Sequence, residues 1–138
     1  MSKRETPITQ WYWREHLRGL LVEEYCLVNR GPACGVRLAD ALVLPGRETR
    51  IAARGERIHI AAGERAVLVQ TKDSRLGMYL MGQTLFSAQL LRRRYPEAQV
   101  ESIALCTQDD EMLRPLLEAY DGCKVVVAPR SAFSVSAV

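Results

Sequence analysis

Apolar residues recur along the chain, first at helical spacing and then in the shorter runs expected of strands. Between residues 11 and 28 apolar positions, among them Trp13, Leu17, Leu20 and Leu21, recur at helical spacing. This spacing predicts a first long helix over 11–28. The glycines and the proline of residues 29–35 would end this helix. The following segment, 36–44, is rich in branched apolar residues and predicts a strand.

Three short β-like segments follow, separated by glycine-centred links. They cover residues 49–53, 57–61 and 66–70. Links this short favour antiparallel neighbours, so we expect a meander of three strands.

A helical period returns after Lys72. It predicts a second long helix over 76–94, followed by a strand at 100–106, a short helix at 111–120 and a strand at 123–128. A strand, a helix and a strand in close succession favour a parallel crossover. The pattern therefore predicts a single α/β domain: a helix, then antiparallel strands, then helix-strand-helix-strand, with a mixed central sheet flanked by helices. Its expected bounds are 11–128, after a polar tail at 1–10 and before a tail at 129–138.

Composition agrees with a folded protein and leaves its partners open. The chain has 138 residues, 48% of them hydrophobic and 25% charged, which suits one compact domain and excludes a disordered chain. The formal net charge of +3 permits contact with nucleic acid without requiring it. The four cysteines show no C-x-x-C spacing, so we expect reduced thiols and no zinc site. The polar start and the short apolar runs predict a cytoplasmic protein.

One charged residue interrupts the apolar strand at 36–44. Asp40 lies between two alanines, where a carboxylate is costly unless it is paired, hydrogen-bonded or bound to a metal. Gln70 and Lys72 stand two positions apart at the end of a later apolar strand and should therefore share a face of the sheet. Lys72 could bind Asp40 in a structural ion pair, or both could belong to a site.

Two further polar residues fall on apolar helical stripes. Glu24 shares the stripe of the first predicted helix, whereas Glu23 lies on its other side, so Glu24 is the better candidate for an inward-facing acid. The alternative is a Glu24 carboxylate that reaches water. Gln83 interrupts the stripe of the second helix and needs polar partners, either in the sheet or on a substrate, unless it is a core glutamine without a role in chemistry.

Three consecutive arginines close the second predicted helix. Arg92, Arg93 and Arg94 suit the negative end of the helix dipole. Alternatively, they are candidate contacts to nucleic-acid phosphates.

The order of these residues resembles the PD-(D/E)XK nuclease superfamily. The matching features are an acid on an N-terminal helix (Glu24 or Glu23), an aspartate on a strand (R37-L-A-D40), a strand ending in Q70-T-K72, and a helix with a glutamine and an aromatic residue (Q83-T-L-F86). The resemblance spans roughly residues 11–128 and implies a restriction-endonuclease-like fold. The order of the motifs along the chain and their placement on helices and strands carry it, because each motif alone is common.

That resemblance also implies roles for these residues. Asp40 and Gln70, with Glu24, would hold Mg²⁺ or Mn²⁺, Lys72 would act on the attacking water or the phosphate, and Gln83 would support the site. The sequence departs from the family pattern at Gln70, which replaces the usual acid and removes one negative charge. A longer segment than usual also separates Asp40 from Gln70.

Three functions follow from this reading. The first is a Mg²⁺-dependent nuclease that hydrolyses phosphodiester bonds in DNA, acts on particular DNA structures, and works as a homodimer or within a complex. The second is a protein of the same fold without hydrolysis, serving as a nucleic-acid-binding or assembly module, which the presence of Gln70 favours. The third is a small-ligand α/β domain in which Asp40 simply pairs with Lys72.

Overall fold

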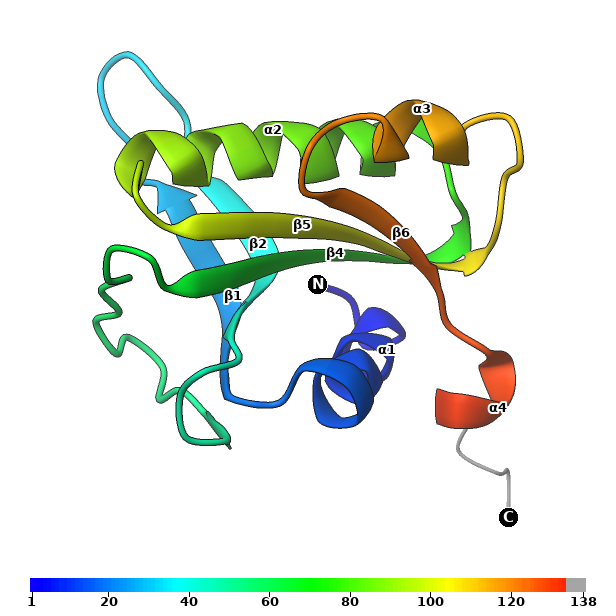
Figure 1. Ribbon diagram of the computed structural model, residues 1–138, viewed down its shortest axis with the longest axis horizontal. Helices are drawn as coiled ribbons and strands as arrows, with labels where there is room; N and C mark the ends of the chain where they lie inside the picture. Colours follow the sequence, from blue (N-terminus) through cyan, green and yellow to red (C-terminus); the bar gives the residue numbers. More distant parts are fainter. Residues whose placement is uncertain (134–138) are drawn as a thin grey trace.

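A mixed β-sheet of six strands runs through the centre of the molecule, and helices cover both of its faces (Figure 1). The computed structural model describes residues 1–133. The strand order is β3-β1-β2-β4-β5-β6. In chain order the elements are α1 (Glu5–Tyr12), the π-helical turn η1 (Trp13–Leu17), β1 (Leu20–Val28), β2 (Arg37–Leu44), β3 (Arg50–Ile51), β4 (Arg65–Arg75), α2 (Met78–Arg94), β5 (Gln99–Gln108), α3 (Arg114–Glu118), β6 (Cys123–Val127) and α4 (Arg130–Phe133).

The pairing of the strands confirms the predicted α/β class. β1 with β2, and β2 with β4, are antiparallel, whereas β4 with β5, and β5 with β6, are parallel. α3 joins the parallel pair β5 and β6, as the strand-helix-strand succession predicted, and α2 joins the parallel pair β4 and β5. Among residues 1–133, no helix is long and apolar enough to span a bilayer.

The first predicted helix, 11–28, is wrong. The helix starts earlier, at Glu5, inside the segment expected to be a polar tail, and it ends at Leu17. The chain then turns at Gly19, whose φ is +81° and where an added Cβ would lie 2.3 Å from the carbonyl oxygen of Leu44. β1 begins directly after this turn. Apolar residues of the helix and of the buried strand run together in the sequence, and their combined spacing mimics one long helix.

The meander expected between residues 48 and 72 is also wrong in part. β3 consists of two residues and pairs parallel with β1, and residues 57–61 form no strand. Ion pairs fold this segment back: Arg47 binds Glu64, and Arg50 binds Glu56 across 2.6 Å. Within 57–61, Ile58 and Ile60 pack against the sheet although these residues form no strand.

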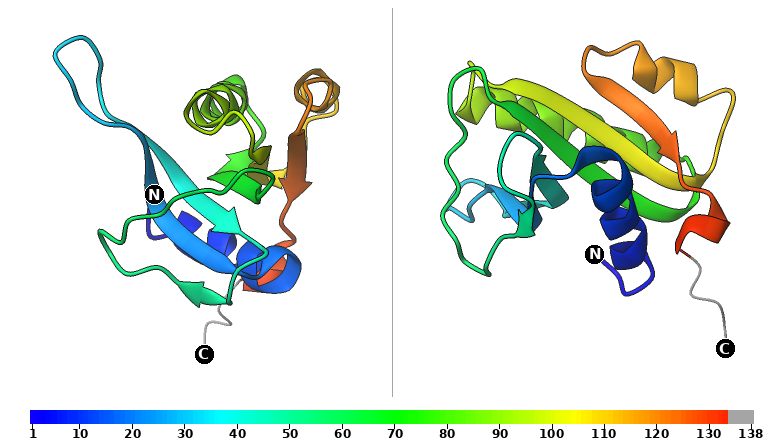
Figure 2. Two further views of the ribbon diagram at one scale, coloured as in Figure 1. Left: turned by 60° about the vertical axis from the view of Figure 1, so that its left-hand side comes forward. Right: turned by 60° about the horizontal axis from the view of Figure 1, so that its bottom comes forward.

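Two apolar layers hold the sheet. On one face α1 packs through Ile8, Trp11 and Tyr12, and on the other α2 packs through Ala88 and Leu91. Figure 2 shows α1 and α2 on opposite sides of the sheet. This arrangement sets which side chains of β2 and β4 face α1 and which face α2.

Candidate functional site

The antiparallel ladder between β2 and β4 ends next to Asp40 and Gln70. Its last pair is Ala41 with Val69, and beyond that point side chains take over the bonding between the strands. The backbone N–H of Asp40 donates to Gln70 Oε1 at 3.3 Å, and the backbone N–H of Thr71 donates to Asp40 Oδ2 at 2.8 Å. The structure therefore brings Asp40 and Gln70 together, through reciprocal contacts between side chain and backbone.

Gln70 is almost completely buried on the α2 side of the sheet. It exposes 1% of its surface, and its Nε2 donates to Ser87 Oγ on α2 at 3.0 Å. Both ends of the amide thus have protein partners, which satisfies a buried polar group. Sequence reasoning missed Ser87. The available signal was a small hydroxyl residue on the buried stripe of α2, four residues after Gln83.

The carboxyl group of Asp40 is partly buried, and its pKa is raised. Burial raises the pKa of Asp40, whereas the N–H of Thr71 and the positive amino group of Met1 lower it. The negative charges of Glu5 and Glu24 raise the pKa further. The carboxylate thus lies near charged groups of α1 and β1, Glu5 and Glu24, whereas the Gln70 amide reaches toward α2.

Glu24 does not lie on the N-terminal helix, whose acids are Glu5 in its first turn and Glu15 near its end. Glu24 lies on β1 with a φ of +51°, and its exposed carboxylate faces the amino group of Met1 at 3.4 Å. Glu23 is on the same strand and accepts a hydrogen bond from Gln10. Glu5 was overlooked because the helix was placed too late in the chain. The apolar spacing of Ile8, Trp11 and Tyr12 was the signal for a helix starting before residue 11.

Lys72 extends from β4 beyond the buried part of the strand. Its side chain is exposed, and among residues 1–133 it forms no hydrogen bond and no ion pair. The ion pair with Asp40 that the sequence left open does not form. Lys72 follows Gln70 by two residues on an extended strand, so alternation directs both toward the α2 side.

Helix α1 is fastened to β4 beside these residues. The hydroxyl groups of Thr9 and Thr71 lie 2.7 Å apart, and both residues are buried. Because Thr71 also donates its N–H to Asp40, the position of the Asp40 carboxylate is coupled to the seating of α1.

Gln83 is half-buried on α2, and its side chain makes no hydrogen bond within the described part of the chain. The glutamine on this helix is therefore not the residue that meets Gln70. A supporting role for Gln83 in the site stays a prediction.

The donors available for a metal ion are oxygens of Asp40 and Gln70. Within residues 1–133 no group of three or more His, Cys, Asp or Glu side chains is placed to hold an ion. One carboxylate and one amide oxygen nevertheless fit Mg²⁺, which keeps several waters and uses one or two protein carboxylates together with substrate phosphates. The two donors lie toward different sides of the sheet, the Asp40 carboxylate toward α1 and the Gln70 amide toward α2, and together they carry one charge fewer than two acids would give.

The three arginines of α2 point to different partners. Arg92 donates to the carbonyl oxygens of Val100 and Asp121, which ties the helix to the start of β6. Arg94 donates to the carbonyl of Cys26 and lies over the ring of Tyr95. Arg93 is exposed and makes no ion pair in the described residues. Among the described residues, the guanidinium groups of Arg92 and Arg94 have protein partners and that of Arg93 has none. Arg93 is therefore the arginine of the three that is free to contact a phosphate.

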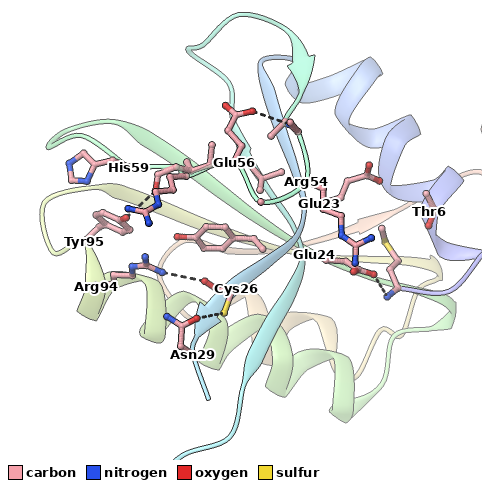
Figure 3. Close-up of a pocket in the computed structure, with 18 residues that line it drawn as sticks. Thr6, Glu23, Glu24, Cys26, Asn29, Arg54, Glu56, His59, Arg94 and Tyr95 are labelled. Atoms are coloured by element: carbon pink, nitrogen blue, oxygen red, sulfur yellow. Dashed lines mark hydrogen bonds and ion pairs between the residues drawn. The ribbon is translucent and has the colours of Figure 1, made fainter. Parts of the chain in front are cut away.

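A pocket on the molecule is not lined by Asp40, Gln70 or Lys72. Its volume is about 1110 Å³, and it is bounded by β1, residues 52–59 and the end of α2. Figure 3 shows Glu23, Glu24, Arg54 and Arg94 around it. Charges of both signs line the pocket, and it shares Met1 and Glu24 with the surroundings of Asp40.

Two solved structures share the fold at low sequence identity. One is a complex of EndoMS with double-stranded DNA, at a TM-score of 0.56 and 13% identity over 90% of this chain. The other is a repair endonuclease from Pyrococcus abyssi, at a TM-score of 0.53 and 14% identity over 94% of this chain. The chain spans 44% and 47% of the length of these two proteins. No protein-family model matches the chain, and no curated protein matches its sequence. The chain thus has an α/β fold similar to that of these two proteins.

Proposed function

We propose that this protein is a Mg²⁺- or Mn²⁺-dependent nuclease that hydrolyses phosphodiester bonds in DNA. The observation that carries the proposal is the meeting of Asp40 and Gln70 where β2 and β4 separate, with Lys72 two residues further along β4. The fold is similar to that of EndoMS in its complex with double-stranded DNA and to that of a repair endonuclease. On this proposal, V67-L-V-Q-T-K72 is a Q-x-K variant of the PD-(D/E)XK motif.

Each residue has a role in this proposal. Asp40 through its carboxylate and Gln70 through Oε1 would hold the ion. A divalent ion supplies charge neutralisation at the phosphate and lowers the pKa of water. Lys72 is exposed and unpaired in the described chain, so its ammonium is available to contact a phosphate whose negative charge increases in the transition state. Ser87 positions Gln70, and Thr71 positions Asp40.

Glu5 and Glu24 supply negative charge close to Asp40. Both raise the pKa of the Asp40 carboxyl, whereas the amino group of Met1 lowers it. Negative charge from the two glutamates favours a cation beside Asp40, and it compensates in part for the charge that Gln70 does not carry. We propose Glu5 as the acid that takes the helix position of the family pattern.

A second candidate function is binding to DNA without hydrolysis. It is favoured by the Gln70 amide, whose two ends are already engaged by Asp40 and Ser87. A neutral amide held in this way is a weaker metal ligand than a carboxylate.

A cleavage assay tests the proposal. Linear, branched and single-stranded DNA are incubated with Mg²⁺ or Mn²⁺ and with wild type, Asp40→Asn, Lys72→Met or Lys124→Met, the last being a matched exposed lysine on β6. We expect cleavage by wild type and Lys124→Met only. Equal cleavage by all four proteins means contamination and overturns the nuclease proposal. DNA binding without cleavage, unchanged by metal, supports the second candidate instead.

A further inference from the structure

The outer face of α2 carries apolar side chains that no other described residue covers. Tyr79 exposes 79% of its surface and Phe86 60%. Together with the half-buried Leu90 they follow one another at spacings of seven and four residues, and therefore form a stripe along one side of the helix. The side chains that pack on the sheet lie on another side of the helix, at Leu80, Thr84, Ala88 and Leu91.

A glycine lies on the same stripe. Gly82 is one turn before Phe86, in the interior of α2, where glycine costs about 1 kcal/mol relative to alanine. A Cβ added at Gly82 would meet nothing within 4 Å. The fold of one chain therefore gives no reason for glycine at this position. Its missing side chain does permit another backbone or a large side chain to approach closely.

The stripe is complementary to itself about its midpoint. Phe86 is the central residue of Met78–Arg94. When a second α2 is placed antiparallel about a two-fold axis at Phe86, Leu90 faces Gly82, and Arg93 faces Tyr79. The Leu90 side chain then packs over Gly82, which has no side chain, and the Arg93 guanidinium lies against the Tyr79 ring. The two Phe86 rings contact each other. A two-fold interface requires this kind of self-complementarity.

Two other features support an antiparallel arrangement. A hollow of about 450 Å³ opens on the stripe beside Phe86, Gln89, Leu90 and Arg93 and could receive the side chains of a second copy. The last turn of α2 carries three arginines, and its first turn has no acidic residue. Antiparallel packing separates the arginine clusters of the two copies, whereas parallel packing would bring them together.

We infer that this protein forms a homodimer through α2, with the helices packed antiparallel along the dimer stripe of Tyr79, Gly82, Phe86, Leu90 and Arg93. Gln70 meets Ser87 on the sheet side of α2, so Asp40, Gln70 and Lys72 are not part of this interface, and Arg93, which is, has no role in the proposed metal site. The inference therefore stands independently of the proposed nuclease function. Because each copy contributes mainly one helix of about 25 Å, we expect a small interface with a Kd of about 10 μM.

Disulfide crosslinking tests the arrangement directly. In a Cys26→Ser, Cys34→Ser background, which removes the two cysteines that are not buried, Tyr79→Cys and Arg93→Cys proteins are mixed and oxidised. We expect a crosslinked dimer in the mixture and none from either protein alone, because positions 79 of the two copies would lie about 21 Å apart. Phe86→Cys should crosslink with itself. A Tyr79→Cys protein that crosslinks alone as efficiently as the mixture would overturn the antiparallel arrangement.

Sedimentation equilibrium tests the dimer without new cysteines. At about 100 μM, wild type should be mainly dimeric, and Phe86→Asp should weaken association by at least about tenfold. Met112→Asp is the matched control, because Met112 is a similarly exposed apolar residue outside the stripe, and it should remain dimeric. Far-UV circular dichroism checks that each variant is folded. A monomeric wild type, or equal weakening by the two substitutions, would overturn the inference.

Discussion

The backbone N–H of Asp40 donates a hydrogen bond to Gln70 Oε1 across 3.3 Å, where the ladder between β2 and β4 has ended. The side chain of Asp40 in turn accepts the N–H of Thr71. The two side chains thus continue the bonding between the strands in place of the backbone. These two hydrogen bonds hold the acid Asp40 and the amide Gln70 side by side on neighbouring strands. A single substitution at Gln70 therefore tests its chemical role.

The change from Gln70 to Glu should make the protein more dependent on metal. Without metal, the new carboxylate is buried near Asp40, and it cannot donate the hydrogen bond that the Gln70 amide gives to Ser87. We therefore expect the free energy of unfolding to fall by about 1–3 kcal/mol. With Mg²⁺, the added charge should restore stability and strengthen metal binding. Denaturant unfolding in EDTA and in Mg²⁺, together with calorimetric titration of Mg²⁺, measures both effects.

Gln99→Glu is the control for the change in net charge, since Gln99 is exposed on β5. It should change neither stability nor its dependence on Mg²⁺. If Gln70→Glu responds to Mg²⁺ no more than Gln99→Glu does, Gln70 is not a metal-ligand position.

Removing the charge of Asp40 should stabilise the metal-free protein at neutral pH. The pKa of Asp40 is raised in the fold, mainly by burial, so the folded state holds the proton more tightly than the unfolded state. Ionised Asp40 therefore lowers stability above its folded pKa, and this cost disappears as the pH falls toward the ordinary carboxyl pKa of 3.8. Asparagine can still accept the N–H of Thr71 and carries no charge.

Unfolding in EDTA from pH 8 to pH 4 measures this effect. Asp40→Asn should be more stable than wild type at pH 8, and the difference should shrink as the pH is lowered. A difference that stays constant over this range would show that the stability change does not come from ionisation.

Lys72→Met should separate activity from stability. Lys72 is exposed and has no partner among residues 1–133, so its replacement should change the free energy of unfolding by less than about 0.5 kcal/mol. If its ammonium contacts the phosphate in the transition state, cleavage should fall by about 100-fold or more. Rates are compared with Lys124→Met under single-turnover conditions. Loss of stability in Lys72→Met alone would point to a structural role for this lysine.

Gly19→Ala should disrupt the turn that joins α1 to the sheet. The φ of Gly19 is +81°, and an added Cβ would lie 2.3 Å from the backbone oxygen of Leu44, so we expect a loss of at least about 3 kcal/mol. Gly46→Ala is the matched control, because a Cβ there meets nothing within 4 Å and no positive φ is involved. Thermal unfolding distinguishes the two. Similar melting temperatures would contradict the close packing at Gly19.

The later elements could be predicted from the sequence because each has one clear period. α2 and the strands β2, β4, β5 and β6 lie where the apolar pattern placed them, with ends shifted by a few residues. The start of the chain could not be predicted in this way. A short helix and a buried strand adjoin at Gly19, and both are apolar, so local spacing does not separate them.

The candidate site, like the fold, could be predicted from the sequence only in part. The sequence by itself determined that Asp40 interrupts a buried strand and that Gln70 and Lys72 share a face, because strand alternation is a local property. Only the tertiary structure decided that Asp40 and Gln70 meet, that Ser87 holds the amide, and that Glu5 lies close enough to shift the pKa of Asp40. These contacts join residues 17 to 35 positions apart, and they depend on where two strands separate and on how α1 and α2 seat on opposite faces of the sheet. Such distances are set by the packing of the whole domain, which no local pattern in the sequence encodes.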